Sequence, residues 1–309
     1  MTDILTITLN PAIDKSTSIA ALIPEKKIRC SVPKFEPGGG GINMARAIKK
    51  LGGHAKALFM AGGYTGFYLT DLLNAKGIES EICPIANPTR ENLVVADLGT
   101  GQQYRFVMPG PSIAGVEWED LLTRIEHSGS PRFIVASGSI PENIPTDIFA
   151  RIGAIAKKKK AKYVVDTSGE ALQYAVKEGV YLLKPNLGEL SSLAGKATIQ
   201  LEQVYETAQS VILQGGCEVM VVSMGAAGAM LVTKNSQKQL APPLVKIKST
   251  VGAGDSMLAG ILLCLEKNLS LEHSLRYGIA CGTAATMNPG TGLCKKEDAD
   301  RLYNLLQDK

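Results

Sequence analysis

The chain has 309 residues, of which 45% are hydrophobic and 20% are charged, so it holds enough apolar material for a substantial buried core. Its 33 basic and 29 acidic residues leave a net charge of only +4, which lacks the basic surplus typical of nucleic-acid-binding proteins. The six cysteines form no CxxC pair and the three histidines form no HExxH motif, which disfavours a disulfide scaffold and histidine-based metal chemistry.

The N-terminal residues Met1–Leu5 have no basic segment followed by an apolar run, so they predict a first strand rather than a signal peptide. No stretch of the sequence is long and apolar enough for a membrane-spanning helix. We therefore expect a cytoplasmic protein whose cysteines are free thiols.

Short apolar runs alternate along the chain with longer amphipathic segments. Buried strands are predicted at Ile4–Leu9, Ala57–Met60, Phe133–Ala136, Tyr163–Val165, Tyr181–Leu183 and Val219–Val222. Helices are predicted between several of these strands, at Asn43–Lys50, Gly66–Lys76, Ile148–Lys160 and Val204–Gln214. This alternation predicts an α/β fold with a mostly parallel sheet flanked by helices, in which ligands bind at the carboxyl ends of the strands.

Two segments, residues 12–36 and 90–108, interrupt the alternation with strand-like patterns. We interpret them as one small β-lid that projects from a single α/β domain spanning residues 1–309. A lid of this kind excludes water from a reaction centre or pairs with a second subunit. Because so small a sheet is not stable alone, pairing of two lids would cover their apolar faces, which predicts a homodimer.

The first glycine-rich segment, Pro37–Ala47, contains four consecutive glycines followed by Asn43. Glycines let the backbone approach a ligand closely, and an amide side chain at the start of the next helix suits sugar hydroxyls. The alternative is a flexible loop with a capping Asn, although four glycines are more than a turn requires.

The run Lys157–Lys160 lies at the C-terminal end of the predicted helix Ile148–Lys160, before the predicted strand Tyr163–Val165. Lysines are favoured at the C-terminal end of a helix dipole, so the run is more typical of a solvated helix end than of an anion-binding or nucleic-acid-binding patch.

Asn186 and Glu189 follow a predicted strand and lie three residues apart, on one face of a helix. This pair suits a hydrated Mg²⁺ ion, but a helix-capping box has the same spacing and is equally compatible with the sequence. The later segment Ser223–Gly228 by itself predicts only a hairpin turn.

The strongest chemical signal is Thr250–Ser256, in which glycines precede Asp255 at the start of an apolar helix. Backbone N–H groups at such a helix start point into one small volume that suits a phosphoryl group, and Asp255 is placed to accept a proton from an attacking hydroxyl. The alternative is a plain capped helix. No Walker A sequence occurs and no GxGxxG follows the first strand, which disfavours P-loop and dinucleotide-dependent enzymes.

Basic residues gather in and beside the two lid segments, at Lys26, Lys27, Arg29, Arg90 and Arg105. Arginine forks pair bidentately with phosphate oxygens, so these residues suit an anionic ligand. Ordinary surface charge is the alternative interpretation.

Taken together, these segments resemble the ribokinase-like (PfkB) family of carbohydrate kinases. The matching segments follow one another along nearly the whole chain, at Asn10–Asp14, Pro37–Ala45, Ser137–Pro141, Asp166–Leu172, Lys184–Glu189, Ser223–Gly228 and Thr250–Ser256. Further segments are similar to the minor-type bacterial 6-phosphofructokinase branch, at Lys27–Cys30, Phe35–Asn43, Tyr104–Gly110 and Gly290–Cys294.

The resemblance implies a ribokinase-like fold and ATP-dependent phosphorylation of fructose 6-phosphate at its 1-hydroxyl. Tagatose 6-phosphate and fructose 1-phosphate are the alternative substrates, because the same motifs serve all three sugars. A non-catalytic sugar-phosphate sensor is the alternative from a different class, although a sensor has no need of a base such as Asp255.

The resemblance also implies roles for individual residues. Asp255 is the catalytic base beside an anion hole formed by Gly252, Ala253 and Gly254. The sugar hydroxyls contact Asp14, Gly38, Gly39, Asn43 and Ser139, and the sugar phosphate contacts Arg90 with Lys27, Arg29 and Arg105 in support. ATP is surrounded by Lys184, Asn186, Ser223, Gly225 and Gly228, and Glu189 organises Mg²⁺ through water. By the same analogy a monovalent cation such as K⁺ has candidate ligands in the backbone carbonyls of Ser249, Val251, Ala285, Asn288 and Gly290.

Overall fold

The computed structural model describes residues 3–307, and its main sheet has nine strands in the order β13-β12-β11-β10-β9-β8-β1-β4-β5. The strands are β1 (Ile4–Thr8), β4 (Lys56–Ala61), β5 (Glu79–Pro84), β8 (Phe133–Ser137), β9 (Lys162–Asp166), β10 (Val180–Leu183), β11 (Cys217–Ser223), β12 (Ala229–Thr233) and β13 (Gln237–Leu240). All neighbouring strands from β5 to β11 pair in parallel, and β12 and β13 add an antiparallel edge. The prediction of a mostly parallel sheet is confirmed.

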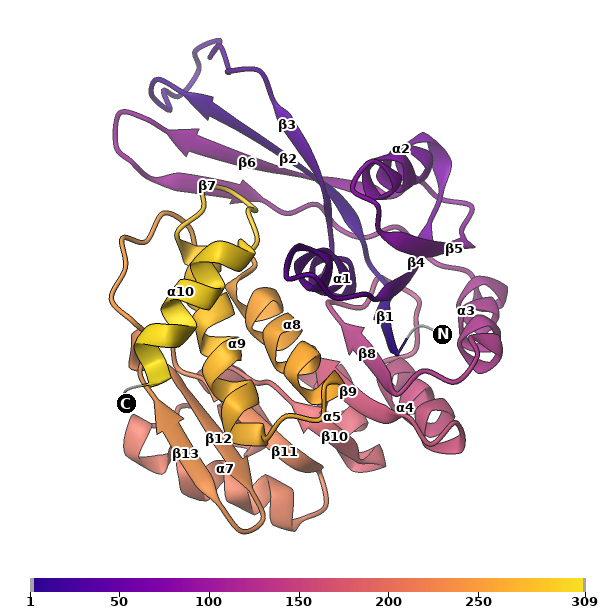
Figure 1. The fold of residues 1–309 in the computed structure, drawn as a ribbon. Helices are drawn as coiled ribbons and strands as arrows, with labels where there is room; N and C mark the ends of the chain where they lie inside the picture. The colour runs from indigo at the N-terminus through magenta and orange to yellow at the C-terminus, as the bar shows by residue number, and fades with distance from the viewer. Residues whose placement is uncertain (1–2, 308–309) are drawn as a thin grey trace.

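Helices cover both faces of this sheet (Figure 1). One face packs against α1 (Gly40–Lys50), α2 (Gly63–Asn74), α8 (Ala253–Glu266), α9 (Leu271–Thr286) and α10 (Lys296–Gln307). The other face packs against α3 (Gly115–His127), α4 (Ile148–Lys158), α5 (Gly169–Glu178), α6 (Leu187–Leu193) and α7 (Val204–Leu213). Along β8, Phe133 and Val135 enter the first core and Ile134 enters the second, so a continuous apolar run is buried on both sides.

The predicted helices differ from the observed ones mainly at their ends. The helix predicted from Asn43 begins at Gly40, and the helix predicted from Gly66 begins at Gly63. The helix predicted to reach Lys160 ends at Lys158, because Lys160 adopts a left-handed backbone conformation with φ 56°. The lysines of this run therefore lie at a helix C-terminus, where their charge is favourable.

A second sheet of four strands projects from the core at the top of Figure 1, in the order β3-β2-β6-β7. Its strands are β2 (Ala12–Ile19), β3 (Lys34–Gly38), β6 (Arg90–Asp97) and β7 (Gln103–Phe106). β2 pairs in parallel with β6, while β3 and β7 pair antiparallel on the two sides. Large apolar side chains remain exposed on and beside this sheet, including Leu22, Ile23, Leu98 and Phe106.

Within residues 3–307, no helix has the length and hydrophobicity required to span a bilayer. The six cysteines are all free thiols, of which Cys30 is exposed and the other five are buried.

Candidate functional site

The strand order reverses at β1, which has β4 on one side and β8 on the other. Such a switch point opens a crevice at the carboxyl ends of the strands. Asn10, just after β1, donates a hydrogen bond from its Nδ2 to Ser139 Oγ, just after β8, at 3.0 Å. Lys184 after β10 and Ser223 at the end of β11 lie along the same edge of the sheet. The predicted site residues of the main sheet therefore share one edge.

The four-glycine run is part of a tightly packed helix start rather than a flexible loop. Gly39 is the N-cap of α1 with φ 115°, and Gly40 and Gly41 already belong to the helix. A Cβ on Gly40 would lie 2.1 Å from Ser137 Oγ, and one on Gly41 would lie 2.7 Å from the Ile7 carbonyl oxygen. Glycine is thus required because α1 packs closely against β1 and β8, and this packing fixes the position of Asn43 in the first turn of α1.

Asp255 is the third residue of α8, whose N-cap Gly252 has a φ of 75° that turns the chain into the helix. Asn43 Nδ2 donates a hydrogen bond to Asp255 Oδ2 at 3.0 Å. Burial raises the pKa of Asp255 to about 7, and the negative charge of Asp166 adds to the rise. Asn43, Lys184 and Arg46 act in the opposite direction. A carboxylate that titrates near neutral pH is well matched to accept a proton from a hydroxyl group.

Lys184 places a positive charge against the amino end of α8. Its Nζ forms an ion pair with Asp166 Oδ1 at 3.3 Å, and a Cβ on Gly254 would lie 3.3 Å from the same Nζ. Burial disfavours the ammonium, but Asp166, Glu189 and Asp255 together outweigh it and raise the pKa of Lys184. The amine and the backbone N–H groups of the helix start therefore offer one anion-binding volume.

Asn186 and Glu189 form a helix-capping box. Asn186 Oδ1 accepts from the Glu189 N–H and Glu189 Oε2 accepts from the Asn186 N–H, both at 2.9 Å. Glu189 Oε1 takes no part in these bonds, so the cap leaves one carboxylate oxygen for a metal-bound water. Burial raises the pKa of Glu189, as does the nearby Asp166. The single free oxygen of Glu189 fits a metal held mainly by phosphate oxygens and water. Residues 3–307 contain no cluster of three or more acidic, His or Cys side chains that could hold a metal ion.

Ser223–Gly228 is a hairpin turn between the antiparallel strands β11 and β12, as predicted. The Ser223 N–H donates to the Pro185 carbonyl at 2.9 Å, which holds this turn beside Asn186. Gly225 and Gly228 both have positive φ, at 59° and 88°, and a Cβ on Gly228 would lie 1.9 Å from the Leu240 carbonyl oxygen. The turn thus borders the crevice next to the capping box.

On the other side of the crevice, Asp14 and Arg90 lie at the base of the small sheet. Asn92 Nδ2 donates to Asp14 Oδ1 at 2.9 Å, and Gly38 leaves room for the other oxygen, since a Cβ there would lie 2.3 Å from it. Burial raises the pKa of Asp14. Arg90 donates to the carbonyls of Met108 at 2.9 Å and Asn10 at 3.0 Å, while its buried Nε has no partner.

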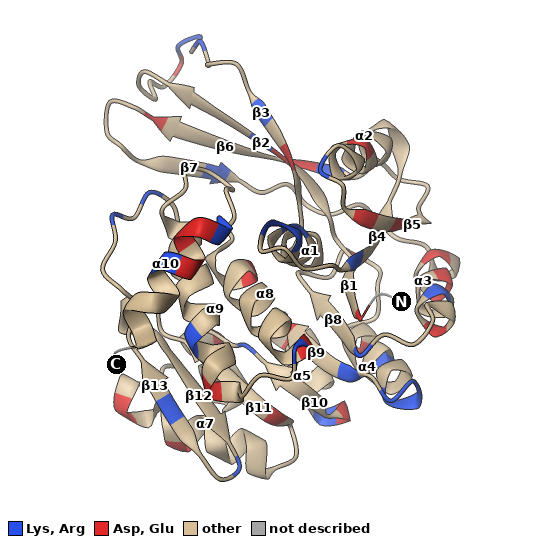
Figure 2. Ribbon diagram, in the orientation of Figure 1, with Lys and Arg blue, Asp and Glu red and all other residues tan. Residues whose placement is uncertain are grey.

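Three residues that are predicted to contact the sugar phosphate lie away from Arg90 of the same chain. Lys27 and Arg29 lie in the exposed loop that joins the outer ends of β2 and β3, and Figure 2 shows basic residues on this loop. Arg105 lies on β7 opposite Val94, four residues along β6 from Arg90.

The candidate cation ligands come from the loop before α8 and from the last turn of α9 with the loop that follows it. Ser249 Oγ donates to the Gly290 carbonyl at 2.8 Å, and the Val251 N–H donates to Ser249 Oγ at 3.2 Å. The Ala285 carbonyl oxygen accepts a hydrogen bond from the Asn288 N–H at 3.1 Å. The two loops are therefore in direct contact, with carbonyl groups of the type that monovalent cations bind.

Four residues without a predicted role also take part in the contacts of the site, namely Asn10, Arg46, Asn92 and Asp166. Asn10 and Asp166 directly follow predicted strands, and that position was the available signal. Arg46 lies three residues after Asn43, on the same helix face.

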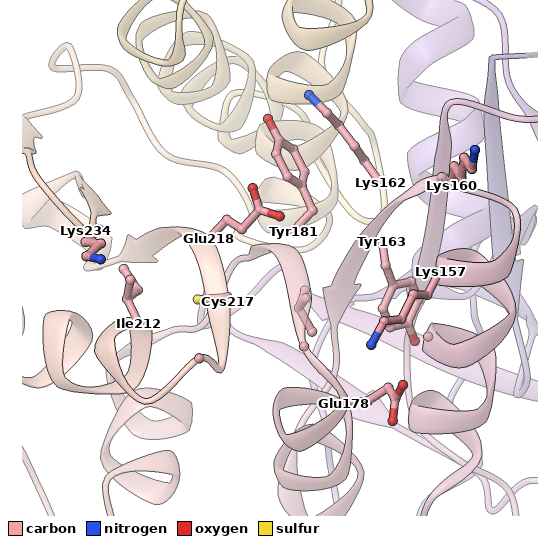
Figure 3. Close-up of a pocket in the computed structure, with 15 residues that line it drawn as sticks. Lys157, Lys160, Lys162, Tyr163, Glu178, Tyr181, Ile212, Cys217, Glu218 and Lys234 are labelled. Carbon is pink, nitrogen blue, oxygen red and sulfur yellow. The ribbon is translucent and has the colours of Figure 1, made fainter.

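A cavity of about 720 Å³ lies at the opposite, amino-terminal edge of β9, β10 and β11 (Figure 3). Lys157, Lys160, Lys162 and Lys234 line it, together with Glu178 and Glu218. The C-terminal ends of α4, α5 and α7 are close to this edge, so their carbonyl groups account for the lysines through the helix dipole. The cavity is separate from the chemistry at the carboxyl edge.

A model of the pfkB family of carbohydrate kinases matches residues 2–298. The chain is 42% identical over 307 residues to the ATP-dependent 6-phosphofructokinase isozyme 2 of Escherichia coli (strain K12), covering 99% of both chains. It is 32% identical over 289 residues to the 1-phosphofructokinase of Bacillus subtilis (strain 168), covering 94% of both.

Solved structures of phosphofructokinase-2 from Escherichia coli have the same fold. Its complex with potassium superposes with a TM-score of 0.96 at 42% identity, covering 99% of this chain and 100% of that one. Its complex with fructose 6-phosphate gives a TM-score of 0.94 at 40% identity, and its tetrameric inhibited form gives 0.94 at 41%, each with the same coverage.

The raised pKa of Asp255 predicts a pH-dependent effect of Asp255→Asn on stability. The unfolded carboxyl titrates at about 3.9, so the folded state loses stability as pH rises from there until it passes the folded pKa of about 7. Asn mimics the protonated form, and the variant should therefore gain stability over the parent chain, by up to about 4 kcal/mol at pH 8 and by little at pH 4. Urea unfolding at both pH values measures the difference.

The exposed Asp71 on α2 provides the control, because Asp71→Asn should change the unfolding free energy by less than about 0.5 kcal/mol at either pH. An equal effect of Asp255→Asn at pH 4 and pH 8 would contradict the raised pKa.

Proposed function

This chain belongs to the pfkB family of carbohydrate kinases, and we propose that it transfers the γ-phosphate of ATP to the 1-hydroxyl of fructose 6-phosphate. The products are fructose 1,6-bisphosphate and ADP. The observation that carries this proposal is the buried carboxylate of Asp255, with a pKa of about 7, at the amino end of α8 beside Lys184. The likeness to 6-phosphofructokinase isozyme 2 along the whole chain supports the choice of sugar.

The reaction is an in-line displacement at phosphorus. Asp255 accepts the proton of the 1-hydroxyl as the sugar oxygen forms its bond to the γ-phosphorus, and the bond from that phosphorus to the bridging oxygen of ADP breaks. The amides of Gly252, Ala253 and Gly254, with the ammonium of Lys184, stabilise the negative charge on the transferred group. The chain supplies mostly positioning and electrostatic stabilisation, as phosphoryl transfer requires.

Substrates are held from both sides of the crevice. We assign the sugar hydroxyls to Asp14, Gly38, Gly39, Asn43 and Ser139, and the 6-phosphate to Arg90. ATP lies along Lys184, Asn186, Ser223, Gly225 and Gly228, at the ends of β10 and β11. The small sheet acts as a lid, and its closure over the sugar would exclude water and limit hydrolysis of ATP.

An ATP-dependent kinase also requires a divalent metal, and we assign Mg²⁺ to the free oxygen of Glu189 through bound water. When bound, Mg²⁺ neutralises charge on the phosphate oxygens. A monovalent cation, K⁺, is assigned to the carbonyls of Ser249, Val251, Ala285, Asn288 and Gly290, in line with the potassium complex of the Escherichia coli protein. Its place beside the anion hole would stabilise the turn that holds Gly252.

We assign the exposed apolar face of the lid to pairing with a second chain, which makes a homodimer. Leu22, Ile23, Leu98 and Phe106 supply the apolar surface. Pairing is also consistent with the predicted phosphate contacts of Lys27, Arg29 and Arg105, since within one chain these residues lie away from Arg90.

The substrate assignment is tested by ADP release with Mg-ATP and a panel of sugars. Fructose 6-phosphate should give the highest kcat/KM, and fructose and ribose should be at least about tenfold poorer because they lack the phosphate that pairs with Arg90. A higher kcat/KM for tagatose 6-phosphate or fructose 1-phosphate would support the kinase chemistry but assign a different sugar as the substrate. Binding of sugar phosphate with no ADP release from any sugar would favour a non-catalytic sensor.

Asp255→Asn should lower kcat for fructose 6-phosphate by about 10²–10⁴-fold, because the amide cannot accept the hydroxyl proton. Binding of fructose 6-phosphate should persist, since Asn keeps the volume and polarity of the side chain. Steady-state kinetics and calorimetric titration measure the two quantities. Near-normal turnover would show that another group is the base.

The lid assignment predicts that multi-angle light scattering gives twice the chain mass. Leu98→Asp should shift the distribution toward the monomer, because it places a charge on the apolar surface of the lid. Leu98 is 71% exposed, and Val116 on α3, outside the lid, is 73% exposed, so Val116→Asp is the matched control and should remain dimeric. A monomeric parent chain would refute the assignment.

A further inference from the structure

A chain of buried hydrogen bonds leads from Asp255 to the base of the lid. Asn43 Nδ2 donates to Asp255, and Asn43 Oδ1 accepts from Arg46 Nη1 at 2.9 Å. Arg46 Nη2 donates to Glu36 Oε1 at 3.0 Å, and Thr291 Oγ1 donates to Glu36 Oε2 at 2.8 Å. The chain of bonds therefore joins α8, α1, the lid strand β3 and the loop between α9 and α10.

The ion pair in this chain is deeply buried, with 3% of the Arg46 side chain and 7% of the Glu36 side chain exposed. Burial of two charges costs about as much free energy as their attraction returns, so such a pair contributes little net stability. Apolar contacts also hold α1 against the core, since its residues Ile42, Met44 and Ile48 are fully buried. Stability alone thus leaves the presence of the ion pair unexplained.

The chemistry of Arg46 determines which way the Asn43 amide faces. A guanidinium group has only donors, so it must meet the Asn43 oxygen, and the amide nitrogen is left to face Asp255. If the Asn43 amide were turned around, its oxygen would face the Asp255 carboxylate, and two hydrogen-bond acceptors would be in contact. Arg46 thereby ensures that Asn43 donates to Asp255 and favours its charged form, which is the form that accepts a proton.

We propose that Arg46 is a positioning residue for the phosphoryl transfer, which orients Asn43 and through it holds Asp255 ready to accept the proton, with Glu36 as its anchor on the lid. This inference rests on the kinase function proposed above. Glu36 belongs to β3, which leads through Gly38 and Gly39 into α1, so the anchor ties the base of the lid to the catalytic carboxylate.

The charges around the chain give the expected sign of each change. Asp255 faces Asp166, Lys184 and Arg46, and Arg46 faces Glu36, Asp14, Asp255 and Lys50. Glu36 also pairs with the exposed Lys34, whose Nζ lies 3.1 Å from Glu36 Oε2. Removal of the Arg46 cation disfavours the carboxylate and raises the pKa of Asp255. Loss of the Glu36 anion leaves the positive charge of Arg46 less compensated, which lowers the pKa of Asp255. A charge that is linked to a carboxyl group through two successive hydrogen bonds shifts the pKa of that carboxyl by about one unit.

The test is the pH dependence of kcat/KM for fructose 6-phosphate at saturating Mg-ATP. Arg46→Met should move the acid limb up by about one pH unit and lower kcat at least about tenfold, whereas Glu36→Gln should move the limb down by a smaller amount. Arg46→Lys keeps the charge without the fork, so it should restore the position of the limb and only part of kcat.

Glu81→Gln is the matched control, because Glu81, like Glu36, pairs with two cations, Lys56 at 2.7 Å and Arg124 at 3.2 Å, at the far edge of the sheet. This variant should leave the acid limb in place. A merely structural pair would give no opposite shifts, and an acid limb unmoved in Arg46→Met and Glu36→Gln would overturn the proposal.

If Arg46→Met does not fold, Glu36→Gln and Arg46→Lys decide the question, and an upward or absent shift in Glu36→Gln counts against the proposal. An active parent chain with an unmoved limb refutes only the role of Arg46. A parent chain that phosphorylates no sugar refutes the kinase function, and the role of Arg46 with it.

Discussion

The close approach of α1 and α8 is the contact on which the site depends. Both helices begin at the carboxyl edge of the sheet, and glycines at their first turns let them come close to the strands and to each other. The bond between Asn43 and Asp255 joins residues 212 positions apart across this contact. A side chain larger than hydrogen at Gly40 or Gly41 would separate α1 from the sheet and move the amide away from the carboxylate.

Around that contact, charge is balanced by residues from several elements. Burial alone would keep Asp255 protonated and inactive as a base, and Asp166 acts in the same direction. Lys184 from the end of β10 and Arg46 from α1 act against this, so the carboxyl titrates near neutral pH. Each charge rests on a different helix or strand, and the proton affinity of Asp255 is therefore a property of the assembled fold.

The sequence predicts the fold well because strands buried on both faces produce uninterrupted apolar runs, as in Phe133–Ala136. It also identifies the loops of the site, since glycine and polar residues that directly follow a buried strand lie at the carboxyl edge of a parallel sheet, where ligands bind. It does not predict contacts such as that of Asn10 with Ser139, 129 residues away, which exists only once the strands are ordered. Arg46 was hidden for a different reason, since on a helix it resembles any surface arginine until Glu36 is placed beside it.

The distribution of thiols offers a convenient way to observe the proposed lid closure. Cys30 is exposed in the loop at the outer end of the lid, whereas the other five cysteines are buried in the core. A maleimide dye would therefore attach selectively to this loop in the natural sequence, without any engineered cysteine. If the small sheet closes over substrates as proposed, the fluorescence of the dye would change in real time during turnover. If two chains pair as proposed, energy transfer between their dyes would report the separation of the two loops.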